Sequence, residues 1–281
     1  MCGRFACYSC GPDLRSKLIK SNVEVADKWQ DEDKFYPRYN MAPRGWVPVI
    51  RRNEQNELII QSMRWGFIPF WAKKMPDVQP INARDETLMA EKSIFDSAKQ
   101  RKRCIVVADG FYEWKKLGDG KKKIPHFVKR KDGKLMLFAG LYDTFEEEDN
   151  VVYTCAIITT TASPFFSSIH DRMPVIFENG SESVQSWLDQ SQGWNDKLNC
   201  SGKSNPNKET IGMSVKTRIY SYQVTDRVGP TKNNSPDFVV PVDQLKGSIA
   251  SFFKKPESAT PKRPAEEQKE QISESKKKKT E

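Results

Sequence analysis

The chain has 281 residues, with 46 Lys and Arg against 37 Asp and Glu, which gives a formal net charge of +9. No apolar run approaches the roughly 18 residues that a membrane-spanning helix needs, so we expect a soluble protein without a membrane partner. No charged and then apolar leader follows the first residue, and six cysteines in a chain of this length do not indicate a secreted disulfide framework. A signal peptide and disulfides are therefore not expected.

The cysteines and histidines also argue against a metal site. Cys7 and Cys10 form a CxxC pair, but the second pair that a zinc site needs is missing, because the other cysteines are isolated and the chain has two histidines. No metal and no cofactor are expected. The basic excess persists when the lysine-rich tail is set aside, which favours a polyanionic partner, although a solvated basic face gives the same count.

Along the chain, short β-rich runs outnumber helical patterns. Helices are predicted over residues 12–20, 84–100 and 181–190, the last beginning at Ser181 and Glu182. Strands are predicted at 46–50, 58–67, 104–114, 125–130, 134–145, 151–161, 173–177 and 215–224. Many strands with few helices predict an α+β domain around a strongly curved, barrel-like, mainly antiparallel sheet with a few flanking helices.

The last part of the chain has a different composition. From about residue 251 it is poor in apolar residues and rich in Lys, Glu, Ser and Pro, which predicts disorder. We therefore divide the chain into one domain over residues 2–245 and a disordered basic tail over 246–281. The clusters "PKRP" and "KKKK" suggest nuclear import, and the alternative is a tail that only aids solubility.

Cys2 has unusual chemistry because of its position. Removal of Met1 would leave Cys2 with a free α-amine beside its thiol, and their reference pKa values of about 8 and about 8.5 leave both nucleophiles partly deprotonated near neutral pH. The alternative is that Cys2 is a small buried hydrophobic residue in a first strand.

Glu113 and His170 are candidates for proton transfer. Glu113 lies between Tyr112 and Trp114 after an apolar strand, where partial desolvation would raise its pKa, and the alternative is a surface glutamate on an edge strand. His170 lies in a predicted loop that enters a strand, as functional histidines often do, although a lone histidine is more often structural.

Several residues could contact nucleic acid. Arg4, Arg84 and Arg172 lie beside polar motifs and could clamp phosphates, or each could pair with a neighbouring acid. The stretch "RWGFIPFWAKK" and Trp114 could stack on unpaired bases, although aromatic residues at this density are more often core.

Six motifs in order carry a resemblance to a known family. "MCGRF", "RYNMAP", "MRWGFIPFWA", "NARDET", "DGFYEW" and "HDRMPVI" resemble the SRAP family, named for SOS-response-associated peptidases, over roughly residues 2–243. The resemblance implies a DNA-repair protein that captures the ring-opened aldehyde of an abasic site in single-stranded DNA at a replication fork. The amine and thiol of Cys2 would close a thiazolidine on the aldehyde carbon, which gives a stable DNA–protein crosslink and shields the lesion from strand cleavage.

The resemblance also implies roles for individual residues. The catalytic set comprises the nucleophile, an acid/base, a residue that helps to open the sugar ring and one that orients the lesion: Cys2, Glu113, His170 and Asn82. The DNA-binding set lies at the flanking phosphates and around the lesion: Arg4, Asn40, Pro43, Arg84, Trp114 and Arg172. The word peptidase would then describe removal of Met1, by the protein itself or by a host aminopeptidase.

The segment "KGSIASFF" resembles a peptide that binds the replication sliding clamp PCNA. Ile249, Phe252 and Phe253 would be the anchors, although Lys246 replaces the usual glutamine and both phenylalanines could instead pack on the domain. We expect a monomer.

Two other function classes remain open. Glutamine amidotransferases also begin Met-Cys-Gly, so an N-terminal-nucleophile hydrolase is one alternative. A non-covalent reader of modified cytosine is the other, and such a protein would tolerate replacement of Cys2.

Overall fold

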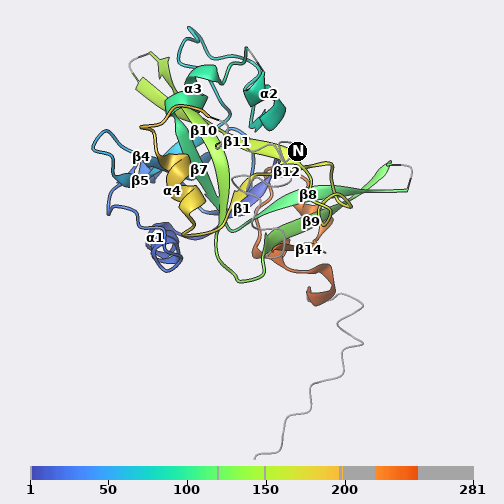
Figure 1. Ribbon diagram of the computed structural model, residues 1–281. Coiled ribbons are helices and arrows are strands. Elements are labelled where there is room, and N and C mark those ends of the chain that lie inside the picture. Colours follow the sequence, from blue (N-terminus) through green and yellow to red (C-terminus); the bar gives the residue numbers. More distant parts are fainter. Residues whose placement is uncertain are drawn as a thin grey trace, which may run out of the picture.

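The computed structural model describes residues 2–90, 92–118, 120–148, 150–195, 198 and 219–245 (Figure 1). No helix within this part of the chain is long and apolar enough to cross a membrane. The tail from residue 246, with the predicted clamp-binding residues Ile249, Phe252 and Phe253, lies outside the described residues, as does the predicted strand segment 215–218.

The core of the molecule is a closed ring of five strands. The strands are β4 (Trp46–Arg52), β5 (Leu58–Trp65), β7 (Arg103–Ala108), β10 (Met136–Glu147) and β11 (Asn150–Thr161). Neighbours pair antiparallel in the order β11, β10, β7, β4, β5, and a short parallel pairing of Cys155 with Trp65 closes the ring. The predicted α+β fold with a barrel-like sheet is confirmed.

Short strands extend this ring at its edges. They are β2 (Trp29–Gln30), which pairs with β5, β6 (Asn82–Arg84) and β12 (Arg172–Pro174), which both pair with β11, and β13 (Ile176–Phe177), which pairs with β10. The sequence predicted one strand over 173–177. It divides at Val175 because the chain leaves β11 there and joins β10.

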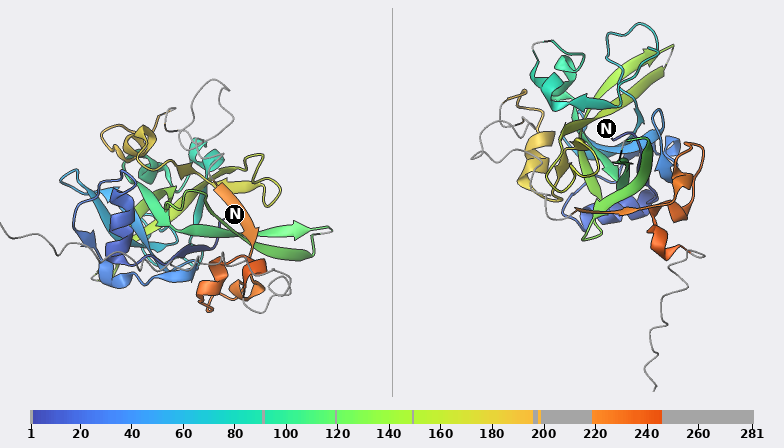
Figure 2. Two further views of the ribbon diagram at one scale, coloured as in Figure 1. Left: turned by 90° about the horizontal axis from the view of Figure 1, so that it is seen from below. Right: turned by 90° about the vertical axis from the view of Figure 1, so that its right-hand side faces the viewer.

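A second, five-stranded sheet crosses the barrel (Figures 1 and 2). Its order is β14 (Ile219–Gln223), β9 (Lys122–Arg130), β8 (Gly110–Leu117), β1 (Phe5–Cys7) and β3 (Arg38–Met41). The ends of β8 and β9 project as a hairpin beyond the body, and the start of the chain lies near the base of that hairpin.

Asp109 marks the corner where the chain passes from one sheet to the other. The sequence predicted one strand over 104–114, but β7 ends before Asp109 and β8 begins after it. Both carboxylate oxygens of Asp109 accept hydrogen bonds from the 8–9 segment, including the main-chain N–H of Tyr8 at 2.8 Å. A side chain at Gly110 would meet the carbonyl of Val128 at 2.7 Å, so only glycine fits at this crossing.

Helices cover the outside of the barrel. They are α1 (Gly11–Ile19), α2 (Asp85–Met89), α3 (Asp96–Arg101) and α4 (Glu182–Leu188), with short 3₁₀ turns at Glu32–Lys34, Asp226–Val228, Pro236–Val239 and Val242–Gln244. The single helix predicted over 84–100 is wrong. It is divided because α2 ends at an extended Ala90, whereas Leu88 and Phe95 both turn inward to the core.

Candidate functional site

Cys2 lies three residues before the start of β1 and is fully buried. The main chain of Arg4 accepts the N–H of Tyr112 at 2.9 Å, which continues the pairing of β1 with β8 towards the amino terminus. The side-chain Nδ2 of Asn82, at the start of β6, donates to the carbonyl oxygen of Cys2 at 3.0 Å. Asn82 therefore contacts residue 2 directly, and β8 holds the main chain two residues further along.

Glu113 is the buried acid beside this position. Because Phe5 pairs with Phe111, the register places Glu113 opposite the residue that follows Cys2. Glu113 is 6% exposed and lies in an interior strand, since β8 pairs with β1 on one side and β9 on the other, so it is not the surface glutamate of an edge strand. Burial raises the pKa of Glu113, and the nearby His170 opposes part of that rise.

The thiol of Cys2 is desolvated in the chain that carries Met1. Burial raises the pKa of this thiol well above its ordinary value, and the negative charge of Glu113 raises it further. The partly deprotonated thiol was predicted for a chain that has lost Met1, so it stays a prediction. The desolvation comes from tertiary packing, which the sequence could not show.

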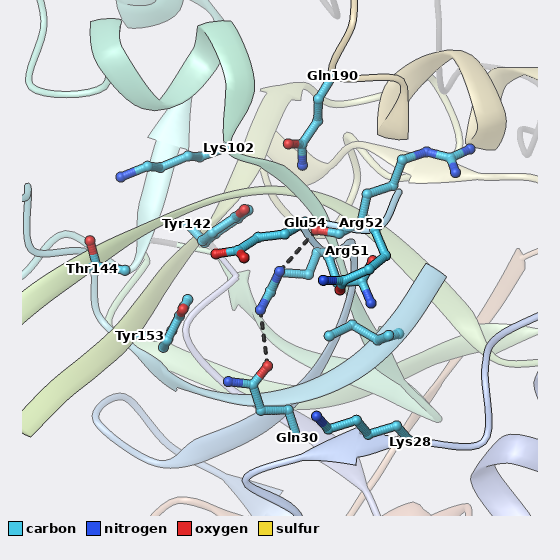
Figure 3. Close-up of a pocket in the computed structure, with 13 residues that line it drawn as sticks. Lys28, Gln30, Arg51, Arg52, Glu54, Lys102, Tyr142, Thr144, Tyr153 and Gln190 are labelled. Carbon is cyan, nitrogen blue, oxygen red and sulfur yellow. Dashed lines mark hydrogen bonds between the residues drawn. The ribbon is translucent and has the colours of Figure 1, made fainter. Parts of the chain in front are cut away.

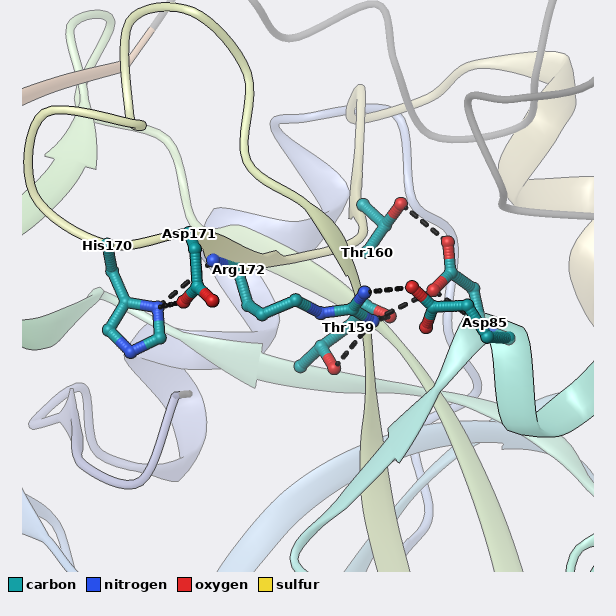
Figure 4. Close-up of polar contacts among 7 residues, drawn as sticks. Asp85, Thr159, Thr160, His170, Asp171 and Arg172 are labelled. Carbon is teal, nitrogen blue, oxygen red and sulfur yellow. Dashed lines mark hydrogen bonds and ion pairs between the residues drawn. The ribbon is translucent and has the colours of Figure 1, made fainter.

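His170 lies in the loop before β12, as predicted (Figure 4). Its Nδ1 is 3.0 Å from the main-chain N of Arg172 and 2.7 Å from a carboxylate oxygen of Asp171. A neutral ring accepts the N–H of Arg172 at Nδ1, whereas a protonated ring donates to Asp171. In both states Nδ1 is used to orient the ring.

Arg172 is held by acids that the sequence analysis did not single out (Figure 4). Its guanidinium donates to Asp85 Oδ1 at 2.8 Å, to Glu86 and to the carbonyl of Thr159 at 2.6 Å. Burial raises the pKa of Asp85, whereas the adjacent Asp85 and the guanidinium lower the pKa of Glu86 to about 2. Both acids lie in the "NARDET" motif, so the signal was present in the sequence.

Arg4, Asn40 and Trp114 form one cluster. The guanidinium of Arg4 donates to Asn40 Oδ1 at 2.7 Å and lies 5.6 Å from the centre of the Trp114 ring. Asn40 is fully buried, and its amide donates to the carbonyls of Val228, Pro230 and Asn233. Asn40 thus anchors the 228–233 segment, a role that could not be read from the sequence.

The other predicted DNA-binding residues are exposed. Pro43 lies in the turn between β3 and β4, and Arg84 at the end of β6. The aromatic stretch before residue 72 divides into two parts: Trp65 and Phe67 are fully buried, whereas Phe70 and Trp71 are 54% and 59% exposed. Phe165, in the loop before His170, is also exposed. The structure therefore brings Cys2, Asn82, Glu113 and His170 together and places exposed aromatic residues in other loops.

Among the described residues, no group of three His, Cys, Asp or Glu side chains could hold a metal ion. The arrangement joins a buried acid, a histidine and an amide donor around the second residue of the chain, whose amine and thiol are its potential nucleophiles.

Comparison with known proteins places this arrangement in a family. The family model described as SOS response associated peptidase (SRAP) matches residues 1–229. The abasic site processing protein YoqW of Bacillus subtilis is 38% identical over 242 residues, which cover 85% of this chain and 99% of that protein. The abasic site processing protein YMR114C of Saccharomyces cerevisiae is 32% identical over 92% of this chain and 73% of its own.

A vertebrate protein and a solved structure extend the comparison. The abasic site processing protein HMCES of Pongo abelii is 28% identical over 89% of this chain and 80% of its own. A crystal structure of a protein from Bacteroides thetaiotaomicron superposes with a TM-score of 0.65, at 23% identity, over 85% of this chain and 99% of that one. That structure supports the fold alone.

Proposed function

The chain belongs to the SRAP family, and from that premise we propose that it processes abasic sites in single-stranded DNA by crosslinking itself to them through Cys2. The relatives named as abasic site processing proteins support the substrate class. The observation that carries the proposal is the convergence of Asn82 and Glu113 on residue 2.

The reaction begins after Met1 is removed, by the protein or by an aminopeptidase. The α-amine of Cys2 attacks the lesion's aldehyde carbon, and loss of water gives an imine. The imine is protonated at nitrogen as an iminium, the thiol sulfur adds to its carbon while the thiol proton passes to the carboxylate of Glu113, and a five-membered thiazolidine with a neutral nitrogen closes. An imine at this carbon would otherwise favour β-elimination, so ring closure protects the strand from cleavage.

The raised pKa of Glu113 suits this order of steps. The amine attacks first, because only the amine can form the imine to which the thiol then adds. Once the positively charged iminium forms beside it, the thiolate is favoured by the opposite charge. Glu113, whose pKa burial raises, can donate the proton that water needs to leave and then accept the proton of the thiol.

Asn82 and His170 would position the sugar. Asn82 donates a hydrogen bond from Nδ2 to the carbonyl oxygen of Cys2. Its Oδ1 is buried and has no hydrogen-bond partner among the described residues. A buried acceptor without a donor is costly, so a sugar hydroxyl is a fitting partner for it. Because Nδ1 of His170 is used for orientation, proton exchange with the opening sugar would run through Nε2.

Exposed aromatic residues favour a single strand as the substrate. Phe70, Trp71 and Phe165 present ring area to solvent, and such rings stack on unpaired bases in a sequence-tolerant way. Trp114 and the cation of Arg4 add a further stacking position near Cys2.

Two further proposals concern the tail and rest on the sequence alone. We propose nuclear import through "PKRP" and "KKKK", and binding of a monomer to PCNA through Ile249, Phe252 and Phe253. Replacing both phenylalanines by alanine should abolish capture by purified PCNA and leave crosslinking unchanged. Capture that persists would reject the clamp proposal.

The experiment that tests the main proposal is a denaturing gel. Protein confirmed by mass spectrometry to lack Met1 is mixed with single-stranded DNA that contains one abasic site, beside intact DNA. A band that survives denaturation and requires the lesion is expected for the natural chain and for the control Cys10→Ala, which removes an exposed cysteine. The band should be lost in Cys2→Ala.

A second variant tests the order of the steps. Cys2→Ser keeps the α-amine but removes the sulfur, so it should give an imine that borohydride traps and that decays to cleaved DNA without borohydride. Absence of any lesion-dependent band from the natural chain would reject the proposal and direct attention to glutaminase activity or to non-covalent recognition of modified cytosine.

A further inference from the structure

A second polar pocket, of about 400 Å³, lies in a different part of the barrel (Figure 3). Its walls come from the end of β4 and from the facing parts of β10 and β11, which contribute Tyr142 and Tyr153. Thr159 pairs with Arg84 beside the candidate site. At the usual rise per strand residue, Thr159 lies about 20 Å beyond Tyr153 along β11. The chemistry proposed at Cys2 does not use this pocket.

The floor of the pocket holds a buried cation whose direct hydrogen-bond partners are neutral, while the carboxylate of Asp31 lies one hydrogen bond further away, on Gln61. Arg51 is 8% exposed, and its guanidinium donates to Gln61 Oε1 at 2.5 Å, to Gln30 Oε1 at 3.1 Å and to the carbonyl of Arg52 at 2.9 Å. Within the part of the chain that the structure describes, it has no ion pair with a carboxylate. Desolvating a charge is costly, and an opposite charge normally offsets that cost.

Two aromatic rings contact Arg51, and some of its N–H groups have no acceptor. Its guanidinium carbon lies 5.7 Å from the ring centre of Tyr142 and 5.3 Å from that of Tyr153, so both rings contact the cation. Three of its N–H groups have acceptors, out of the five that a guanidinium carries, which leaves one on each terminal nitrogen. Two N–H groups on a fixed, planar fork match two oxygens of one oxyanion.

The rest of the lining adds positive charge and a further donor. Lys28 and Arg52 line the pocket, and Arg52 lies close enough to Asp189 to lower the pKa of that carboxyl, whereas Glu54 is the acidic side chain of the lining. Lys102 also lines it but is neutralised by Asp143.

Gln190 supplies an independent observation. It lines the same pocket beside the hydroxyl of Tyr142, with which its side chain interacts, and its buried Nε2 makes no hydrogen bond of normal geometry among the described residues. A side-chain amide carries two N–H groups, so at least one remains for an acceptor in the pocket.

We propose that this pocket is a second binding site for a phosphate-bearing ligand, with two phosphate oxygens on the free N–H groups of Arg51 and a third acceptor on Gln190. The excess of cations over acids suits a multiply charged anion better than a single carboxylate. The volume admits a group larger than phosphate alone, so the phosphate comes from a free nucleotide or from a DNA strand that extends beyond the main site. The inference does not rest on the reaction at Cys2.

The test measures binding to the full chain with Cys2→Ala, so that no crosslink forms. Isothermal titration with pyrophosphate and with deoxyadenosine monophosphate should give saturable binding, and succinate, a dianion without phosphorus, should bind at least tenfold more weakly. In parallel, the affinity for an undamaged single-stranded oligonucleotide is measured at the same ionic strength.

Three further substitutions in that background locate the site. Arg51→Gln should weaken phosphate binding about tenfold or more, because charge-assisted hydrogen bonds are lost. Gln190→Glu, in a half-buried turn, should do the same by placing a negative charge in the pocket, and its melting temperature is measured beside that of the parent chain to show that it folds. Arg227→Gln removes an exposed arginine elsewhere and should change affinity less than twofold.

The outcomes separate the sources of the phosphate. If both pocket variants weaken the binding of pyrophosphate and deoxyadenosine monophosphate, the ligand is a free nucleotide. If both variants weaken only the binding of the oligonucleotide, the phosphate comes from DNA. The proposal is overturned if succinate binds as well as pyrophosphate. It is also overturned if Gln190→Glu leaves every affinity unchanged. Absence of a lesion-dependent crosslink from the natural chain would overturn the proposed function and leave this result standing.

Discussion

The side-chain amide of Asn82 donates a hydrogen bond to the main-chain carbonyl of Cys2, so a residue at the start of β6 fixes the position of the second residue of the chain. The remaining oxygen of that amide is buried without a described partner. The same side chain can therefore hold the nucleophile with one atom and the substrate with the other.

Asn82→Asp tests this double role. The substitution keeps the shape of the side chain but removes the donor and brings a negative charge beside the carbonyl of Cys2. We expect the single-turnover crosslinking rate to fall about tenfold or more, in line with the roughly 1–3 kcal/mol that a buried unsatisfied group costs. A rate within twofold of the natural chain, with an unchanged melting temperature, would contradict it.

Glu113→Gln should change how the stability of the fold depends on pH. The pKa of Glu113 is raised above its ordinary value of 4.5, so the folded state binds this proton more tightly than the unfolded state does. The associated stability is fully present below about pH 4.5 and is lost as pH rises through the folded pKa. The natural chain should therefore lose more stability between pH 5 and pH 8 than Glu113→Gln does, which urea denaturation at each pH can measure.

The same variant should crosslink slowly. Without an acid/base at position 113, the rate should fall about a hundredfold, in the range typical of general acid–base catalysis. Single-turnover gels at several pH values provide the measurement. A rate for Glu113→Gln that equals the natural one across the pH range would exclude this carboxyl from the reaction.

Arg172→Ala should destabilise the fold. Its guanidinium and the carboxylate of Asp85 are 11% and 5% exposed, so removing the cation leaves a buried acid uncompensated, at a cost of about 3 kcal/mol. Asp85→Asn in the same chain should restore much of the loss. Urea denaturation of the two variants gives both values, and an Arg172→Ala chain as stable as the natural one would contradict the assignment.

The protruding hairpin should bind DNA backbone. Lys116 and Lys123 lie directly opposite each other on β8 and β9, and like charges in this position are unfavourable unless an anion lies between them. Replacing both by glutamine in a Cys2→Ala background should reduce the slope of log affinity against log salt by about 1.4, at roughly 0.7 for each of the two single-strand phosphate contacts. Lys20→Gln, at the end of α1, is the control and should leave the slope unchanged.

Cysteine labelling tests the burial of Cys2 directly. Among the described cysteines, Cys10 is exposed, and burial raises the pKa of the Cys2 and Cys7 thiols. Brief treatment of the chain that carries Met1 with iodoacetamide should therefore modify Cys10 and spare the buried thiols, which peptide mass spectrometry can show. Rapid labelling of Cys2 would contradict the burial described above.

The sequence predicted the parts of this molecule that local patterns control. Alternation around Glu113 indicated a partly desolvated carboxyl, and the loop before "MPVIF" correctly placed His170 between a turn and a strand. Local patterns failed where tertiary contacts decide. The helix over 84–100 divides because Leu88 and Phe95 must both reach the core, and Asn40 is an anchor because three carbonyls from the 228–233 segment surround it.

The pairing of β1 with β8 sets how this family can vary. One residue added between Gly110 and Glu113 would turn the carboxyl to the opposite face of the sheet and separate it from Cys2. Residues added at the far end of the β8–β9 hairpin would leave that register untouched. Evolution can therefore lengthen or shorten the hairpin freely, and an engineer can insert a fluorescent reporter there, without moving an atom at residue 2.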